Sequence, residues 1–372
     1  MQALIWFIVI ITPIVFIHEF GHFFFARLFG VKVDVFSIGF GKPLFKWKDN
    51  KDTTWQIALI PLGGYVKMHG DEGVAGNPDV NKLENLSEEE KKLSFYHKKL
   101  WQKALIVFGG PFANYVLAIA IFTSIALHSG VMEFKTEVSR VQEGSPAQKA
   151  GIQVGDIIVE LNSKKIKLAR DLASTLMLNV KDEITIGYVR GNTYFTVNII
   201  PNFVEVRGVA EEQIKQPVIG VMFEKYNYTT VGPLEAITRS IEQALDFSYT
   251  TLQAILQMLT GQRNTDDIGG PIKIAKYSVK MAEQGFLTFL HLVALISLNL
   301  GLVNLLPIPM LDGGHLFYYT IEAIIGRSIN YTVQNMGFKI GFAIIISLMI
   351  FAFWNDLRNV EFLANLKKII FN

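Results

Sequence analysis

The sequence predicts a polytopic α-helical membrane protein with about four spans, a membrane-associated β element and an inserted soluble α/β domain. Of its 372 residues, 50% are hydrophobic and 18% are charged. This balance is too apolar for an ordinary soluble protein and too charged for a wholly embedded one. The apolar residues gather in long runs with polar stretches between them, so membrane spans that alternate with polar domains fit best.

The composition also excludes several kinds of site and partner. The chain has no cysteine, so disulfides and thiolate ligands are excluded and any metal site must use histidine and carboxylate. The formal net charge is +2, and lysines are interspersed with acidic residues. This charge pattern lacks the basic footprint of a nucleic-acid-binding protein, and we expect no nucleic-acid partner.

Four segments are apolar over about the 20 residues that a membrane helix needs. The first has no basic residue before it and no small-residue cleavage pattern after it, so we expect a retained span rather than a signal peptide. In the fourth and shortest, Lys339 must extend toward the interface. The predicted spans are residues 1–28, 104–128, 286–316 and 335–355.

The lysines and arginines predict the orientation of these spans. Arg27 is the first basic residue, and a lysine-rich stretch precedes the second span, so the loop of residues 29–103 should be cytoplasmic. The N-terminus, the inserted domain and the tail of residues 356–372 should then lie on the outer side. The lysines of that stretch are Lys91, Lys92, Lys98, Lys99 and Lys103.

The loop of residues 29–103 contains two kinds of pattern. Residues 31–65 alternate apolar and polar side chains between glycines and a proline, which predicts a β element beside the membrane. Residues 71–103 are polar, and Ser87 precedes three glutamates as a helix N-cap would. We expect it to form a short surface helix that leads into the second span, and a solvated linker is the alternative.

Residues 132–202 have the composition of an α/β domain, with strands expected at 157–161, 183–189 and 194–200. Residues 143–152 read EGSPAQKAGI and residues 154–158 read VGDII. This run resembles the PDZ domains of bacterial membrane-associated proteases. Such domains bind an extended peptide at a sheet edge, and a steric gate over a membrane site is the alternative. A single copy is visible.

Residues 203–285 have apolar side chains at helical spacing. They predict amphipathic helices that either lie on the outer membrane face or pack against the PDZ domain. The side chains are those of Ile237, Ile241, Ala244, Leu245, Phe247, Ile255, Leu256 and Leu259.

The first span contains the sequence His18-Glu19-Phe20-Gly21-His22. Residues four apart share one face of a helix, so both imidazoles can reach one zinc ion while Glu19 stands close enough to activate its water. A charged group inside a bilayer is costly, so Glu19 calls for a function. A proton-relay carboxylate of a transporter, with the histidines as its hydrogen-bond partners, is the alternative.

A catalytic zinc site needs a third protein ligand, and Asp312 is the best candidate. It lies in residues 304–315, which read NLLPIPMLDGGH. Pro307 and Pro309 break the helix there, so irregular backbone and a carboxylate coincide at membrane depth. The other histidines are scattered singly.

Together these motifs resemble the site-2 protease family of intramembrane metalloproteases, in particular its bacterial regulator-of-sigma-E protease branch. An HExxH sequence alone is weak, but its pairing with the run around Asp312 is specific. The departures from the family pattern are a single PDZ copy, where some relatives carry two, and a short chain. The matching segments are residues 18–22, 39–41, 61–68, 109–114, the PDZ run and residues 304–315.

The resemblance implies a zinc endopeptidase of the bacterial inner membrane that cleaves spans of substrates already trimmed outside, such as anti-sigma factors or remnant signal peptides. His18, His22 and Asp312 would bind Zn²⁺ and Glu19 would be the general base. Expected partners are a transmembrane substrate, membrane lipid and, if the PDZ domain binds peptide, a peptide ligand. Substrate would contact Asn304, Pro307 and Pro309, and a re-entrant β element with Gly63, Gly64 and Tyr65.

Three alternatives stay open on the sequence. A non-catalytic PDZ-bearing adaptor or transporter could use the same fold. Asn114 is either an interhelical hydrogen-bonding residue or a direct participant in catalysis. His315 either orients Asp312 without binding the metal itself or packs among its neighbours.

Overall fold

The computed structural model describes residues 2–70, 86–178, 183–207, 213–262 and 269–358. The chain forms two compact units, one of residues 1–121 with 269–372 and the other of residues 122–268. Helix α4 (Leu100–Ser129) is continuous from the first unit into the second. Of the predicted loop, residues 71–85 lie outside the described part, and so do residues 359–372 of the predicted tail.

Four helices are long and apolar enough to span a membrane: α1 (Gln2–Leu28), α4, α9 (Phe286–Asn304) and α11 (Tyr331–Arg358). With the sheets and the α/β domain, they confirm the predicted fold class. Helix α9 ends at Asn304, earlier than residue 316, because Pro307 and Pro309 cannot continue a helix. A separate helix, α10 (Asp312–Ile325), follows.

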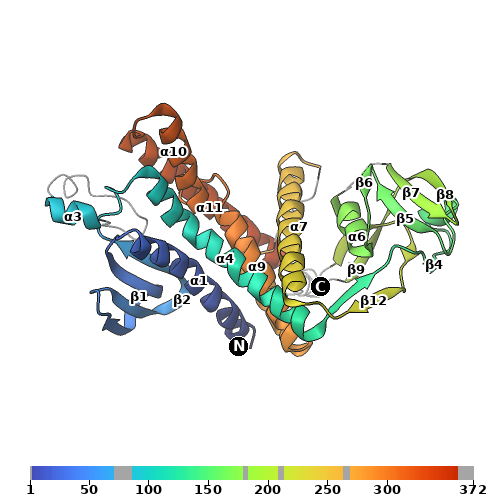
Figure 1. Ribbon diagram of the computed structural model, residues 1–372, viewed down its shortest axis with the longest axis horizontal. Coiled ribbons are helices and arrows are strands. Elements are labelled where there is room, and N and C mark those ends of the chain that lie inside the picture. Colours follow the sequence, from blue (N-terminus) through green and yellow to red (C-terminus); the bar gives the residue numbers. More distant parts are fainter. Residues whose placement is uncertain (1, 71–85, 179–182, 208–212, 263–268, 359–372) are drawn as a thin grey trace, which may run out of the picture. The chain divides into compact units, whose positions relative to one another are not determined.

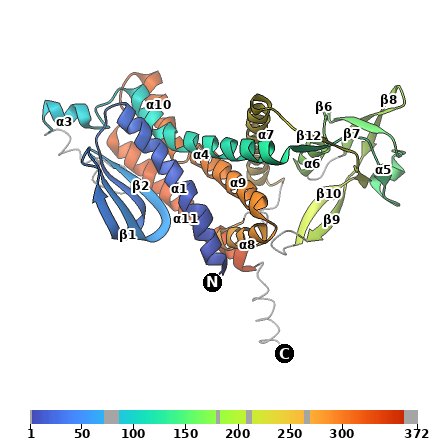
Figure 2. The same ribbon diagram turned by 60° about the horizontal axis from the view of Figure 1, so that its bottom comes forward.

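Helices α1 and α4 cross with their backbones in close contact (Figures 1 and 2). A Cβ atom on Gly109 would lie 2.7 Å from the carbonyl oxygen of Gly21, and one on Gly21 would overlap the carbonyl of Gly109. Gly110, next along α4, faces the rings of His18 and His22 and likewise has no space for a side chain. Small residues permit this approach between membrane helices.

The other end of α1 packs on α9 and on α8 (Pro271–Glu283). Ile10 and Ile14 form a buried cluster with Phe289 and Val293 of α9, and Ala282 of α8 packs against it. The carboxylate of Asp356 in α11 accepts hydrogen bonds from the first N–H groups of α8, at 2.8 to 3.1 Å. This side-chain cap joins the end of α11 to α8.

The β element consists of antiparallel strands β1 (Val33–Lys48) and β2 (Thr54–Met68). Residues 33–38 of β1 pair with residues 54–57 and also with residues 64–68, because β2 folds back across β1. Phe36 and Trp55 stack with ring centroids 4.4 Å apart, and both pack on Phe23 of α1. The predicted β element therefore lies directly against the first span (Figures 1 and 2).

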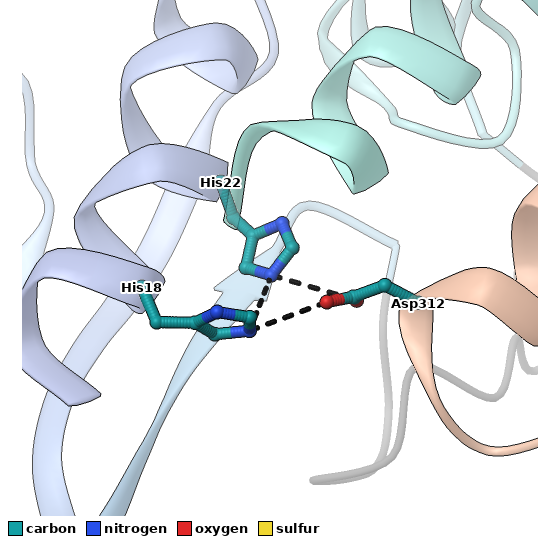
Figure 3. Close-up of side chains that lie close together, drawn as sticks. All are labelled: His18, His22 and Asp312. Carbon is teal, nitrogen blue, oxygen red and sulfur yellow. Dashed lines mark hydrogen bonds and ion pairs between the residues drawn. The ribbon is translucent and has the colours of Figure 1, made fainter. Parts of the chain in front are cut away.

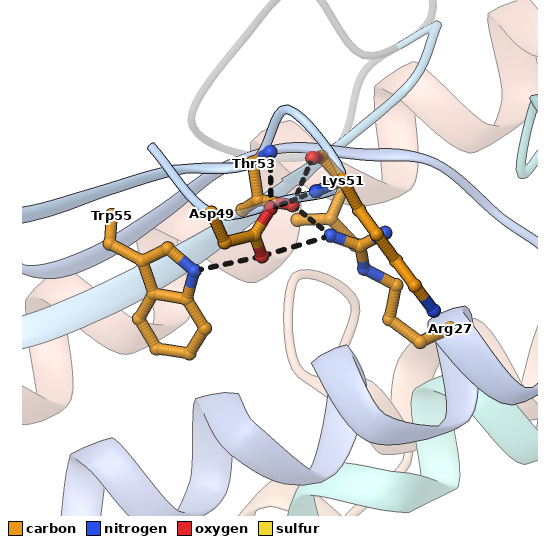
Figure 4. Close-up of polar contacts among 6 residues, drawn as sticks. Arg27, Asp49, Lys51, Thr53 and Trp55 are labelled. Atoms are coloured by element: carbon orange, nitrogen blue, oxygen red, sulfur yellow. Dashed lines mark hydrogen bonds and ion pairs between the residues drawn. The ribbon is translucent and has the colours of Figure 1, made fainter. Parts of the chain in front are cut away.

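An ion pair joins the end of α1 to the turn between these strands (Figure 4). Arg27 donates to Asp49 at 3.2 Å and to the hydroxyl of Thr53, and Trp55 Nε1 donates to Asp49 at 3.1 Å. Desolvation acts to raise the pKa of Asp49, but hydrogen bonds from Trp55, Lys51 and Thr53 and the Arg27 charge outweigh it and lower that pKa. This contact fixes the sheet against α1.

The second unit contains a four-stranded sheet in the order β6-β5-β7-β8. Its core includes Ile158, Leu161, Ile184 and Ile186. The three strands predicted from the sequence are found within one residue of their expected positions. The elements of this domain are β4 (Arg140–Val141), α5 (Pro146–Lys149), β5 (Ile157–Leu161), β6 (Lys164–Lys165), α6 (Ala169–Leu178), β7 (Ile184–Arg190) and β8 (Thr193–Ile199).

The domain continues beyond residue 202, where the sequence prediction ended it. Four strands come before the helices expected in residues 203–285, and Ile219 is buried in the domain core. Strand β11 pairs with β4, and β12 pairs with β3 just after α4. Such short strands give little alternation to detect. They are β9 (Asn202–Arg207), β10 (Gln213–Val218), β11 (Val221–Met222) and β12 (Tyr226–Thr229), with β3 at Val131–Phe134.

Two helices follow, as the apolar spacing predicts. Helix α7 (Pro233–Leu259) buries Ala236, Ser240, Ala244 and Ser248, and α8 comes after it. The glutamate run also forms the predicted surface helix, α3 (Glu88–Leu93), with Ser87 as its N-cap in a capping box.

We expect Gly109→Ala to lower the free energy of unfolding by about 1–3 kcal/mol, because the added methyl group overpacks the helix crossing. Thermal unfolding of the detergent-solubilised chain measures this. Val116→Ala, on an exposed position of the same helix, should stay within about 0.5 kcal/mol of the parent. Equal stability of all three proteins would contradict the proposed close crossing.

Candidate metal centre

His18 and His22 from α1 and Asp312 from the first residue of α10 point toward one another (Figure 3). The two Nε2 atoms are 3.3 Å apart. Asp312 Oδ2 lies 3.2 Å from His18 Nε2, and its Oδ1 lies 3.5 Å from His22 Nε2. Within the described part of the chain, these residues form the one cluster of three such side chains that could hold a metal ion.

These distances fit zinc. Tetrahedral zinc holds nitrogen and oxygen ligands at about 2.0–2.1 Å, which places neighbouring ligand atoms about 3.3 Å apart. The three separations of 3.2, 3.3 and 3.5 Å lie around this value. Two imidazoles and one carboxylate leave a fourth position open, as in catalytic zinc sites.

Helix α4 contacts the ring nitrogen of each histidine that does not face the cluster. His22 Nδ1 lies 2.9 Å from the carbonyl oxygen of Ile106, and His18 Nδ1 lies 3.1 Å from the side-chain amide of Asn114. Partners at the second ring nitrogen fix the orientation of metal-binding histidines. The contact to Ile106 had no signal in the sequence, because any residue supplies a main-chain carbonyl.

The break between α9 and α10 places Asp312. Gly313 and Gly314 lie so close to the carbonyls of Leu306 and Ile308 that neither position has space for a Cβ atom. The first turn of α10 can therefore lie directly on the preceding loop, with Asp312 directed at α1.

Of the three substrate residues predicted in this segment, Asn304 is at the cluster. Its Nδ2 lies 3.4 Å from His18 Nε2. Pro307 is exposed, and Pro309 packs against Gly341 of α11. Both prolines lie in the loop that follows Asn304 and precedes Asp312, and substrate contact by them stays a prediction.

The three residues predicted in the β element take different positions. A Cβ atom on Gly64 would lie 3.0 Å from Glu19 Cγ, so this part of β2 runs alongside the predicted base. Tyr65, the next residue, points to the opposite face of the strand, where Gln56 donates to its hydroxyl at 3.0 Å. Gly63 has a φ of 135° and packs on the Phe40 ring.

His315 lies one turn after Asp312. Its described ring contacts are with Tyr319 and Phe338, at centroid distances of 6.4 and 5.1 Å. These contacts favour the packing role over an orienting one.

The fold defines a multi-pass membrane protein, and its first span carries the two histidines of a histidine–aspartate cluster that could hold a metal ion. The chain belongs to peptidase family M50, whose sequence pattern matches residues 6–348. This membership confirms the resemblance found in the sequence.

Several curated proteins are similar over nearly their whole length. "Putative zinc metalloprotease RC0203" of Rickettsia conorii is 40% identical, covering 97% of this chain and 99% of that protein. "Metalloprotease MmpA" of Caulobacter vibrioides is 33% identical, covering 95% and 94%. Among solved structures, the PDZ domain of an SdrC-like protein from Listeria innocua matches with 25% identity and a TM-score of 0.21, covering 26% of this chain and 99% of that one.

We expect His22→Ala and Asp312→Ala to lose the zinc that the purified wild-type protein should hold at about one ion per chain, because each removes one of three ligands. Elemental analysis of the detergent-solubilised proteins measures the content. His315→Phe is the matched control and should keep its zinc. Retention of zinc by Asp312→Ala would remove Asp312 from the ligand set.

Proposed function

We propose that this protein is an intramembrane zinc metalloendopeptidase. The observation that carries the proposal is the cluster that His18 and His22, on a candidate membrane span, form with Asp312 at the start of α10. Glu19 follows His18 on the same span. Family membership supports hydrolysis of peptide bonds, and the spacing of the cluster supports zinc as its metal. Membrane-spanning segments are the substrates that such a position would reach.

Glu19 is the proposed general base. When bound, zinc would supply a Lewis acid that makes water more acidic and polarises a peptide carbonyl. Glu19 accepts a proton from the attacking water and passes it to the departing amine. Asn304 is proposed to donate a hydrogen bond from its side-chain amide to substrate backbone, and its position beside the cluster supports this role.

Substrate must unwind before it can react, because a membrane helix has all its backbone groups paired internally. The segment of β2 around Gly64 is proposed to hold the unwound chain as an added strand. It pairs with β1 on one side, no described strand pairs on its other side, and it passes Glu19. Gly63 and Tyr65 would contribute backbone groups to this pairing.

The substrates proposed are membrane proteins already trimmed on the outer side, of the anti-sigma-factor or remnant-signal-peptide type, as the family resemblance implies. The PDZ domain would either bind a peptide of these proteins or exclude untrimmed ones by size. We place the protein in a bacterial inner membrane, in contact with lipid and with the PDZ domain on the outer side.

We expect Glu19→Gln to abolish cleavage of a reconstituted single-span substrate while zinc content stays equal to wild type, because the amide cannot accept the proton. Product formation on gels and elemental analysis of the same samples measure both quantities. Cleavage at the parental rate would remove Glu19 as the base. A wild-type protein that holds no zinc and cleaves nothing would favour the adaptor or transporter.

The absence of cysteine allows a direct test of orientation. We expect Lys165→Cys, in the PDZ domain, to react with a membrane-impermeant maleimide in intact spheroplasts, whereas Lys92→Cys, in the loop before α4, should react only after lysis. Both native side chains are exposed. The side of the membrane on which each cysteine lies, rather than its burial in the protein, therefore decides whether it is labelled. Labelling of Lys92→Cys in intact spheroplasts would reverse the proposed topology.

A further inference from the structure

A buried contact between two spans involves one of the proposed zinc ligands. Asn114 of α4 is fully buried, with 0% of its surface exposed. Its side-chain Nδ2 lies 3.1 Å from His18 Nδ1, and its Oδ1 has no hydrogen-bond partner among the described residues. An unpaired buried polar atom is uncommon in proteins and calls for an explanation.

The proton on the His18 ring decides what this contact does. A neutral imidazole carries one N–H group and one lone pair, on different nitrogens. As the amide is oriented, Nδ2 donates to Nδ1, which would place the ring proton on Nε2. That proton would point at Asp312 and His22 and would prevent Nε2 from binding a metal.

A half-turn of the amide reverses this assignment. Amide oxygen and nitrogen have nearly the same shape, so the turned side chain occupies the same space. Oδ1 then accepts the N–H of His18 Nδ1, and the Nε2 lone pair faces the cluster. Either orientation leaves one amide atom without a described partner, so the pairing of the amide itself favours neither orientation.

We propose that Asn114 is a positioning residue of the metal site: its side-chain oxygen accepts the Nδ1–H of His18 and keeps the Nε2 lone pair directed at the metal. This inference rests on the proposed function, in which His18 binds zinc. The equivalent contact of the other imidazole supports it, because His22 Nδ1 lies 2.9 Å from the carbonyl of Ile106 on the same helix. One helix thus supplies an acceptor to each ring.

The surrounding helices hold Asn114 in place. Ser297 of α9 donates to its main-chain oxygen at 2.9 Å. Gly301, one turn further along α9, packs so closely that a Cβ atom there would lie 3.2 Å from Asn114 Cβ. The amide therefore has little freedom except rotation of its own plane, which is the motion that the proposal requires.

The test is the zinc affinity of the full-length chain in detergent, measured by competition with a chromophoric chelator. Asn114→Leu should raise the dissociation constant about 10–100-fold, as loss of such outer contacts does in other sites. Asn114→Asp, which can only accept, should bind zinc at least as tightly as wild type. Thr123→Val, which removes a buried hydroxyl elsewhere in α4, should leave the affinity unchanged.

A purely structural role for Asn114 predicts a different pattern. A buried carboxylate is then more disruptive than leucine, so Asn114→Asp would be the weaker zinc binder of the two. That order, or a folded Asn114→Leu protein with wild-type affinity, would overturn the inference. If Asn114→Leu does not fold, the test rests on Asn114→Asp. A folded Asn114→Asp protein that binds zinc more weakly than wild type would then be enough to overturn the inference.

The same assay separates this inference from the proposed function. His18→Ala should lose high-affinity zinc. If it binds zinc as wild type does, or wild type binds none, the proposed ligand set fails and the Asn114 inference falls with it. If His18→Ala loses zinc while Asn114→Leu keeps it, only the Asn114 inference fails.

Discussion

The close crossing of α1 and α4 is the constraint on which the rest of the site depends. Two imidazoles and two carboxylates lie on or against a span whose other residues are almost all apolar, and each buried polar atom there needs a partner. Gly21 and Gly109 bring the two backbones into contact, which allows a main-chain carbonyl and an amide of α4 to reach the rings of α1. A larger residue at either glycine would separate the rings from both partners.

Helix α1 directs the candidate metal ligands and the proposed base to different sides. Successive residues of an α-helix are about 100° apart, so Glu19 leaves the face that His18 and His22 share. That rotation directs it to β2, where Gly64 lies against it. Phe23, Phe36 and Trp55 and the ion pair of Arg27 with Asp49 hold the sheet on this side. The proposed base thus lies beside both the candidate metal cluster and a strand edge that pairs with no other strand in the described part of the chain.

Residue patterns predicted those parts of the structure whose conformation is determined by the local sequence. The spans, the HExxH face and three PDZ strands follow from periodicity over many residues, and Asp312 from its chemistry beside two prolines. The strands of residues 202–229 were missed because they are short and are stabilised by pairing with β3 and β4, far away in the sequence. For a similar reason, the sequence could not decide between the two roles considered for Asn114: its partner His18 lies on another helix, far away in the sequence.

The connection between the two units limits how the PDZ domain could influence the site. The second unit, residues 122–268, joins the first at only two points in the chain, through α4 and through the segment between α7 and α8. Helix α4 is continuous from the residues that contact the imidazoles to β3 of the second unit. The other connection leads to α8, which packs on α1 at residues that precede His18 in the sequence. If the second unit binds a peptide, an effect that passes along the chain would reach the candidate metal ligands through α4 or α8, and both helices contact α1.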